Sequence, residues 1–259
     1  MGYEADAVLS HSRNSPIAVV LAAGVGRRLG AAHDGPKMLL AFAGRSLLDR
    51  RLAALAACGV EEVAMTVGHE ADAIRAEVAR LAPPLTVRFV DNPDYRLGSL
   101  VSLAVQREAL TSGRPVLVMD GDVLHDARMI DRLFAGDAEG TLLVDPELEP
   151  GDEPVKVCFR GDRIVDFRKL PEDAGDRHGE SVGFFRFEPA LAADLSRRCD
   201  ERLAAGDARL EYEEAIRDLI LRDPARFAAV DVGDLPWTEI DFEEDVAKAR
   251  DHVLPQLVD

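Results

Sequence analysis

A glycine-rich loop after the first apolar segment carries residue types that suit phosphate binding. Residues 21–30 are Leu-Ala-Ala-Gly-Val-Gly-Arg-Arg-Leu-Gly, and Pro36 and Lys37 follow. Glycine lets the backbone approach a ligand and point its N–H groups at phosphate oxygens, and basic side chains add charge. The dinucleotide motif GxGxxG fails because Leu29 takes its last glycine position, and the Walker motif fails because Pro36 replaces its lysine. Arg28 and Lys37 are therefore candidate phosphate ligands; the alternative is a surface loop with solvated bases.

The same loop resembles a known signature. Leu21-Ala-Ala-Gly-x-Gly-x-Arg28-Leu followed by Pro36-Lys37 is similar to the motif of nucleotidyltransferases that act on NTPs and phosphorylated small molecules. The resemblance implies a Rossmann-like (GT-A-like) α/β fold whose loop wraps the base and triphosphate, with catalytic phosphate contacts from Arg28 and Lys37. It departs from the family pattern at Arg27, where many members have a small residue. The nucleotide contacts that it implies in the loop come from Leu21, Ala22, Ala23, Gly24 and Gly26.

Two acidic segments far apart in the chain offer oxygen ligands for a divalent cation, which a triphosphate needs in a chain of net charge −17. Asp120-Gly-Asp122 follows an apolar segment, and open parallel sheets bind ligands at the carboxyl ends of their strands. Glu239 and Asp241 flank Ile240, so they share one strand face if Ile240 anchors in the core. The alternatives are a simple turn for the first segment and a solvated strand end or helix N-cap for the second.

The second acidic segment extends the resemblance to one branch. Trp237-Thr-Glu239-Ile-Asp241 is similar to the C-terminal motif of the cytidylyltransferases for phosphocholine and for phosphonates such as 2-aminoethylphosphonate. By this resemblance Asp122 and Asp241 hold Mg²⁺, with Glu239 nearby, and both aspartates should face Lys37. An Asn-Pro segment, a Ser-Leu helix start and a Gly-Glu-Ser segment match as well. The further site residues that we predict are Asn92, Ser102 and Asp120 for the nucleotide, and Glu180, Ser181, Lys156 and Trp237 for the acceptor.

The resemblance predicts a Mg²⁺-dependent transfer of CMP from CTP to a small phosphate or phosphonate acceptor, with release of pyrophosphate. The acceptor stays open, because Gly98-Ser99 stands where choline-type members often carry Thr and Asn. The chain also has few aromatic residues (5%) from which to build a cage for a quaternary ammonium. Lys156 or Lys169 could hold the acceptor's phosphate or be solvated. The alternatives are a sugar-1-phosphate, inositol-phosphate or molybdenum-cofactor nucleotidyltransferase, or a nucleotide-sensing module without catalysis.

Alternating strand-like and helix-like segments would position these residues. The segments up to residue 140 predict a mostly parallel sheet with helices on both faces. The short strands after Gly140 predict an antiparallel extension. Residues 1–15 are predicted to be a loose arm, and 16–254 a single domain with a nucleotide-binding half (about 16–140) and an acceptor-binding half (about 141–254). The predicted strands are 17–23, 61–67, 85–90, 115–119, 141–144, 155–160, 163–167, 181–187 and 227–232, with a short element at 237–241; the predicted helices are 46–58, 71–81, 100–110, 129–134, 190–205, 212–221 and 243–253.

Composition limits the partners. With 48 acidic against 31 basic residues, the chain repels nucleic acid and anionic membrane surfaces, so neither is expected as a partner. The three cysteines are far apart and form no CxxC, which fits a reducing compartment without a zinc site. We see no signal peptide or membrane span and therefore expect a cytoplasmic protein. A homodimer is a candidate assembly that no motif specifies.

Overall fold

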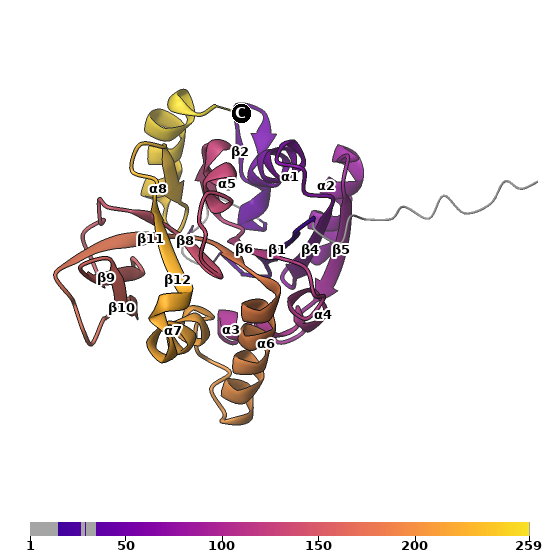
Figure 1. The fold of residues 1–259 in the computed structure, drawn as a ribbon. Helices are drawn as coiled ribbons and strands as arrows, with labels where there is room; N and C mark the ends of the chain where they lie inside the picture. Colours follow the sequence, from indigo (N-terminus) through magenta and orange to yellow (C-terminus); the bar gives the residue numbers. More distant parts are fainter. Residues whose placement is uncertain (1–14, 27–28, 30–34, 259) are drawn as a thin grey trace, which may run out of the picture.

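The computed structural model describes residues 15–26, 29 and 35–258. Nearly all of the predicted arm 1–15 therefore lies outside the described residues, and so does Arg28. Within the described part, nine strands form one sheet in the order β10-β9-β11-β6-β1-β4-β5, while β8 pairs with β11 and β12 (Figure 1).

The first half of the sheet is parallel. Its strands β6, β1, β4 and β5 lie side by side and run in one direction. Because both faces of β1, β4 and β6 are covered, these three strands are mostly apolar and almost wholly buried, whereas the edge strand β5 is partly exposed. These strands are β1 (Ile17–Ala22), β4 (Glu62–Val67), β5 (Thr86–Asp91) and β6 (Val116–Asp120).

The second half is the predicted antiparallel extension. Its central strand, β11, pairs antiparallel with β6, β8 and β9, which joins the extension to the parallel half. β12 then adds to β8 in parallel. The mostly parallel, Rossmann-like α/β fold with an antiparallel extension is confirmed. The strands of the extension are β8 (Gly140–Asp145), β9 (Lys156–Arg160), β10 (Arg163–Arg168), β11 (Arg177–Phe187) and β12 (Phe227–Asp231).

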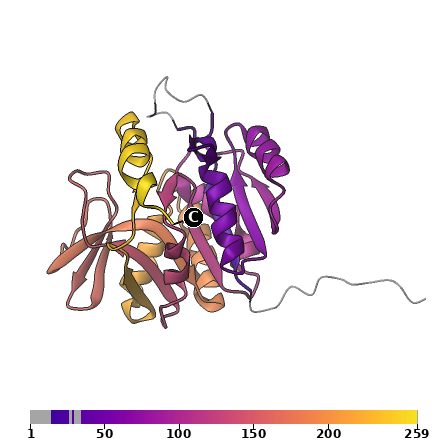
Figure 2. The same ribbon diagram turned by 90° about the horizontal axis from the view of Figure 1, so that it is seen from above.

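Helices cover both faces of the sheet (Figures 1 and 2). Ile17 and Val19 of β1 pack into one core cluster with α3, α4, α6 and α7, while Ala18 and Val20 pack into another with α1, α2 and α5. Leu52 of α1 is 1% exposed, so the apolar stripe of that helix faces the sheet. The helices are α1 (Leu47–Ala57), α2 (Ala71–Leu81), α3 (Ser99–Ala104), α4 (Arg107–Leu110), α5 (Arg128–Leu133), α6 (Pro189–Ala204) and α7 (Glu213–Arg222).

Two predicted helices differ from the structure. The predicted helix 100–110 divides into α3 and α4, because the Gln106 N–H donates to the Leu103 carbonyl three residues back, at 3.0 Å, and so closes a tighter turn between the two helices. The predicted helix 243–253 is α8 (Glu243–Lys248) followed by a π-helical turn, η4 (Ala249–Val253), and a 3₁₀ turn, η5 (Leu254–Gln256). No helix among the described residues combines the length and apolar character that crossing a membrane requires.

Several short elements were not predicted. The most important is β7 (Val123–His125), which pairs antiparallel with β13 (Trp237–Glu239) in a separate two-stranded sheet. The others are η2 (Lys37–Leu39), β2 (Ala41–Phe42), β3 (Arg45–Ser46) and η3 (Pro224–Arg226).

Candidate active site

A cavity of about 390 Å³ opens at the carboxyl ends of β1 and β6. The chain adds β4 and β5 on one side of β1 and β6 on the other, so the strand order reverses between these two strands. Open α/β sheets bind ligands at such a point. Ten of the sequence-predicted site residues line this cavity: Leu21, Ala22, Gly24, Gly26, Lys37, Asp120, Asp122, Ser181, Glu239 and Asp241.

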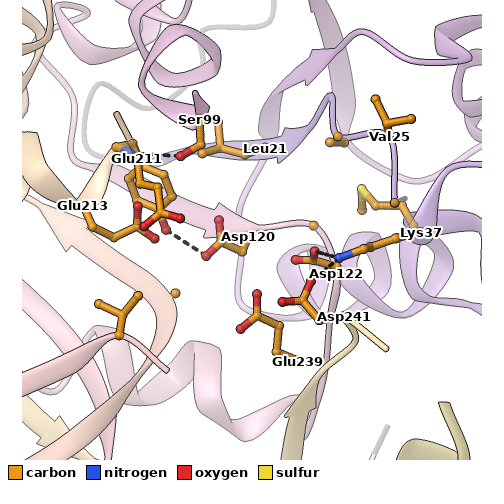
Figure 3. A pocket seen from close by; sticks show the side chains of 18 of the residues that line it. Leu21, Val25, Lys37, Ser99, Asp120, Asp122, Glu211, Glu213, Glu239 and Asp241 are labelled. Carbon is orange, nitrogen blue, oxygen red and sulfur yellow. Dashed lines mark hydrogen bonds and ion pairs between the residues drawn. The ribbon is translucent and has the colours of Figure 1, made fainter. Parts of the chain in front are cut away.

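The ammonium of Lys37 bridges two carboxylates that are distant in sequence (Figure 3). Its Nζ donates to Asp122 Oδ2 at 2.7 Å and to Asp241 Oδ1 at 2.6 Å. Burial disfavours the ammonium, but the two carboxylates outweigh this cost and raise the pKa of Lys37 above its usual value. Lys37 therefore stays positively charged at neutral pH. The expected convergence of Asp122, Asp241 and Lys37 is present.

The pairing of β13 with β7 brings the two acidic segments together. Glu239 lies opposite Val123, immediately after Asp122 in the chain. Ile240 continues this contact, because its N–H donates to the Asp122 carbonyl at 3.0 Å. The Ile240 side chain is fully buried, as the predicted alternation requires. Glu239 and Asp241, on either side of it, are thus held beside Asp122.

Three carboxylates form a cluster that could hold a metal ion. One oxygen each from Asp122, Glu239 and Asp241 lies within 4.8 Å of the others. Glu239 is exposed toward the cavity, but enclosing protein and the charges of Asp122 and Asp241 raise the pKa of its carboxyl well above the usual value. A divalent cation would relieve this repulsion, and clustered carboxylate oxygens are the ligands that Mg²⁺ prefers. The residues present therefore fit such an ion.

Asp120 lies between the two ends of the cavity in Figure 3. It accepts a hydrogen bond from the Tyr212 hydroxyl at 2.8 Å. Gly183 makes room for it, because a Cβ at that position would lie 2.1 Å from Asp120 Oδ2. Burial, together with the charges of Glu213 and Asp122, raises the pKa of Asp120 well above its usual value. Asp120 thus has protein partners on the side that faces the extension.

The other end of the cavity is acidic. Lys169 donates to Glu211 at 2.9 Å and to Glu153 at 3.2 Å, so its charge is already shared between two carboxylates. Glu213 Oε2 is buried and has no hydrogen-bond partner among the residues that the structure describes. Burial and then the charge of Glu211 raise the pKa of Glu213 to about 8. Sequence reasoning missed Glu211 and Glu213 as site residues, since a charged segment before a helix looks the same when it is merely solvated.

Three predicted nucleotide contacts do not line the cavity. Asn92 is 1% exposed, and its amide donates to the Ser102 hydroxyl at 3.0 Å. Asn92 Oδ1 also accepts from the Asp94 N–H at 3.0 Å, which holds the start of a loop whose Tyr95 reaches the cavity. Ala23 is buried, and its carbonyl accepts from the backbone of the neighbouring loop. In the structure these three residues are buried and do not line the cavity.

Three of the four predicted acceptor contacts also lie elsewhere. Glu180 and Trp237 line a second cavity of about 520 Å³, which shares Glu239 and Asp241 with the first. The Trp237 indole N–H donates to Asp145, and Glu180 accepts from the backbone of the loop before β9. The Lys156 ammonium donates to three backbone carbonyls and lines neither cavity. The predicted role of Arg28 concerns a residue outside the described part.

Residues 18–182, more than half of the chain, match the profile of the MobA-like NTP transferase domain. The chain belongs to this family. Its predicted membership of the NTP-dependent nucleotidyltransferases is thereby confirmed.

Two curated relatives of this family member match along most of the chain. The bifunctional IPC transferase and DIPP synthase of Rubrobacter xylanophilus is 32% identical over 244 residues, which are 92% of this chain and 52% of that protein. The CMP-5'-(3-aminopropyl)phosphonate synthase of Streptomyces rubellomurinus is 31% identical over 247 residues, 90% of this chain and 38% of that protein. The chain thus spans about half the length of the first and less of the second.

Solved structures share the fold. The inositol-1-phosphate CTP transferase from T. maritima superposes with a TM-score of 0.73 at 21% identity, covering 89% of this chain and 91% of that one. The CTP:phosphocholine cytidylyltransferase from Streptococcus pneumoniae gives 0.70 at 19% identity, covering 90% and 97%.

Proposed function

We propose that this chain transfers CMP from CTP to a small phosphate or phosphonate acceptor, releases pyrophosphate and uses Mg²⁺. The observation that carries the proposal is the meeting of Lys37, Asp122 and Asp241 in a cavity that the glycine loop also lines. The names of the relatives support the base and the acceptor class, since they include a CMP-phosphonate synthase and two CTP transferases. The predicted division into a nucleotide-binding and an acceptor-binding half belongs to this proposal.

The reaction joins an acceptor oxygen to the α-phosphorus of CTP and breaks the bond between the α-phosphorus and its bridging oxygen. The electron pair leaves with pyrophosphate. Because a phosphate or phosphonate oxygen is already an anion, no general base is needed, and catalysis consists of positioning and charge neutralisation. Lys37 would neutralise phosphate charge. Asp122 and Asp241, with Glu239, would hold Mg²⁺, which supplies further charge stabilisation.

The acidic end of the cavity favours an acceptor that carries an amine. Lys169 is paired with Glu153 and Glu211, whereas no described residue forms a hydrogen bond with the buried Glu213 Oε2. An ammonium group would give that oxygen a charged donor. The rings that line the cavity are Tyr95 and Tyr212, fewer than a trimethylammonium cage usually has. We therefore propose an aminoalkyl phosphonate or phosphate as the acceptor. Inositol and sugar phosphates are the alternative, since their hydroxyls can also donate to carboxylates.

A substrate panel tests this function. CTP, GTP, UTP and dTTP are each combined with 2-aminoethylphosphonate, phosphocholine, inositol-1-phosphate or glucose-1-phosphate, with Mg²⁺, and pyrophosphate is measured. We expect the fastest release from CTP with 2-aminoethylphosphonate, and no release after chelation of the metal. A preference for another base or a sugar phosphate would contradict the proposed substrates. Binding of CTP without pyrophosphate release from any pair would indicate a nucleotide-sensing module instead.

The variant Glu213→Gln tests the choice of an amine. It should raise the KM for 2-aminoethylphosphonate by about tenfold or more, because hydrogen bonds between charged groups are the strong ones. Ethylphosphonate, which lacks the amine, is the matched control and should show the same KM with both proteins. Since the pKa of Glu213 is raised to about 8, the carboxylate forms as pH rises toward that value. The wild-type KM for the aminated acceptor should accordingly fall by a larger factor between pH 6 and 8 than the variant's, since ionisation of the acceptor's own phosphonate affects both proteins alike. Equal effects on both acceptors would refute the assignment.

A further inference from the structure

A buried arginine lies directly behind the acidic turn that follows β6. Arg51, on α1, is 1% exposed. Its Nη1 donates to the Asp120 carbonyl at 2.9 Å, and its Nη2 donates to the Val123 carbonyl at 3.2 Å. One planar guanidinium therefore forms hydrogen bonds with both ends of the segment 120–123, which carries the Asp122 carboxylate. The ring of Phe184 covers the guanidinium, with its centroid 4.4 Å from Arg51 Cζ.

This guanidinium is costly to bury. The hydrogen bonds of the Arg51 guanidinium go to two backbone carbonyls rather than to carboxylates, and its Nε has no partner among the described residues. Burial lowers the pKa of Arg51 to about 9, although the charges of Asp120 and Asp122 oppose this shift. An apolar side chain of similar volume would fill the same space without that penalty. Stability alone therefore does not account for an arginine at this position. An apolar residue could not make the two hydrogen bonds to the Asp120 and Val123 carbonyls.

The turn is held from its other sides by backbone contacts. The Gly121 N–H donates to the Leu21 carbonyl at 3.0 Å, and the Ile240 N–H donates to the Asp122 carbonyl at 3.0 Å. A Cβ on Gly121 would lie 2.6 Å from the Leu21 carbonyl oxygen, so the turn packs closely against β1. Arg51 holds the same turn from the α1 side of the sheet, through its hydrogen bonds to the Asp120 and Val123 carbonyls.

We propose that Arg51 is a positioning residue, which fixes the backbone of residues 120–123 so that Asp122 meets Asp241 and Lys37 in the cavity. Arg51 does not line the cavity itself. Its positive charge lies behind the turn and so also offsets the repulsion among the carboxylates in front of it. Its removal should loosen the turn and weaken cation binding while the sheet stays folded.

The neighbouring Arg50 provides a matched control. It lies on the same helix, is 8% exposed, and donates to the Phe42 carbonyl at 3.0 Å, away from the turn. The variants Arg51→Met, Arg51→Lys, Arg50→Met and Arg50→Lys are compared with the wild type. Thermal unfolding first establishes which of them are folded, and the lysine variants keep the comparison available if a methionine variant does not fold.

Hydrogen–deuterium exchange of peptides covering 116–126 is the first readout, and it does not depend on the proposed function. Amides of the turn should exchange faster in both Arg51 variants than in the wild type. In both Arg50 variants they should exchange at the wild-type rate. The proteins are compared under conditions in which the same fraction of each is folded. The second readout rests on the proposed metal site: the Kd for Mn²⁺ alone should rise by about tenfold in Arg51→Met and less in Arg51→Lys. Unchanged exchange of the turn in a folded Arg51 variant, or equal changes in the Arg50 variants, would overturn the proposal. Absence of Mn²⁺ binding by the wild type would count against the metal site, and the exchange result would still decide the role of Arg51.

Discussion

Replacing Lys37 by methionine should lower the rate of pyrophosphate release by about a hundredfold to a thousandfold, which is the typical cost of losing one preorganised group that stabilises charge in a transition state. The Lys37 ammonium donates hydrogen bonds to both Asp122 and Asp241. Methionine keeps most of the volume of the side chain and removes the charge. Rates are measured with saturating CTP and acceptor, and Lys248→Met, at a surface lysine on α8, is the control that should retain wild-type turnover.

The same variant should bind a metal ion more tightly when no nucleotide is present. In the wild type the ammonium lies between the two carboxylates that we propose as ligands, so an incoming cation must compete with it. Without the ammonium, Asp122 and Asp241 repel each other until a cation arrives. Mn²⁺ should therefore raise the melting temperature of Lys37→Met more than that of the wild type. Normal turnover of Lys37→Met would contradict the proposed role of Lys37 in catalysis, and weaker Mn²⁺ binding would contradict the competition between its ammonium and the metal ion.

The second large effect is expected for Asp241→Asn. Amide replacement keeps the shape of the side chain but removes the negative charge that attracts both Lys37 and a divalent cation. We expect turnover to fall by about three orders of magnitude and the Mg²⁺ concentration for half-maximal rate to rise. The fold should persist, because Ile240 and the pairing of β13 with β7 anchor the segment.

The control for this variant is Asp234→Asn, which removes a surface carboxylate that pairs with Arg132. It should leave both the rate and the Mg²⁺ requirement unchanged. If Asp241→Asn kept wild-type turnover at low Mg²⁺, Asp241 would not be a metal ligand. A loss of turnover equal to that of the surface control would point to the same conclusion.

Strands β1, β4 and β6 of the parallel half could be predicted because both of their faces are buried. In β1, Ile17 and Val19 face one layer of helices and Ala18 and Val20 face the other, so the whole segment must be apolar. Such a run stands out without knowledge of its neighbours. Amphipathic helices such as α2 (Ala71–Leu81) were equally clear, because their spacing is a local property.

The contacts that complete the site could not be predicted from local patterns. β7 has only three residues, and its pairing with β13 joins segments more than a hundred residues apart. The bond between Tyr212 and Asp120 and the grip of Arg51 on the turn likewise depend on tertiary packing. An arginine on an amphipathic helix is usually predicted to face solvent, whereas Arg51 is almost completely buried. The family resemblance supplied Asp122 and Asp241, and the structure shows what holds them together.

Asn92 and Ser102, which the motif predicts as nucleotide contacts, lie outside the cavity lining in the structure. Their side chains bond to each other inside the fold, and the residues of the same loop that reach the cavity are Tyr95, Arg96 and Ser99. A motif marks the segment that matters, but which of its side chains points inward depends on the backbone path. Lys156 is a similar case, because its ammonium donates to carbonyls of the loop before β9 and to the Lys169 carbonyl after β10.

Transfer of CMP from CTP to the acceptor is tested most directly by ³¹P NMR of the wild-type protein with CTP, 2-aminoethylphosphonate and Mg²⁺. We expect the triphosphate signals to decay while pyrophosphate and a CMP–phosphonate anhydride appear in equal amounts, and we expect Asp241→Asn and chelation of Mg²⁺ each to stop the conversion. Binding of CTP without any new phosphorus signal, with this acceptor and with the other acceptors of the panel, would contradict the proposed transfer.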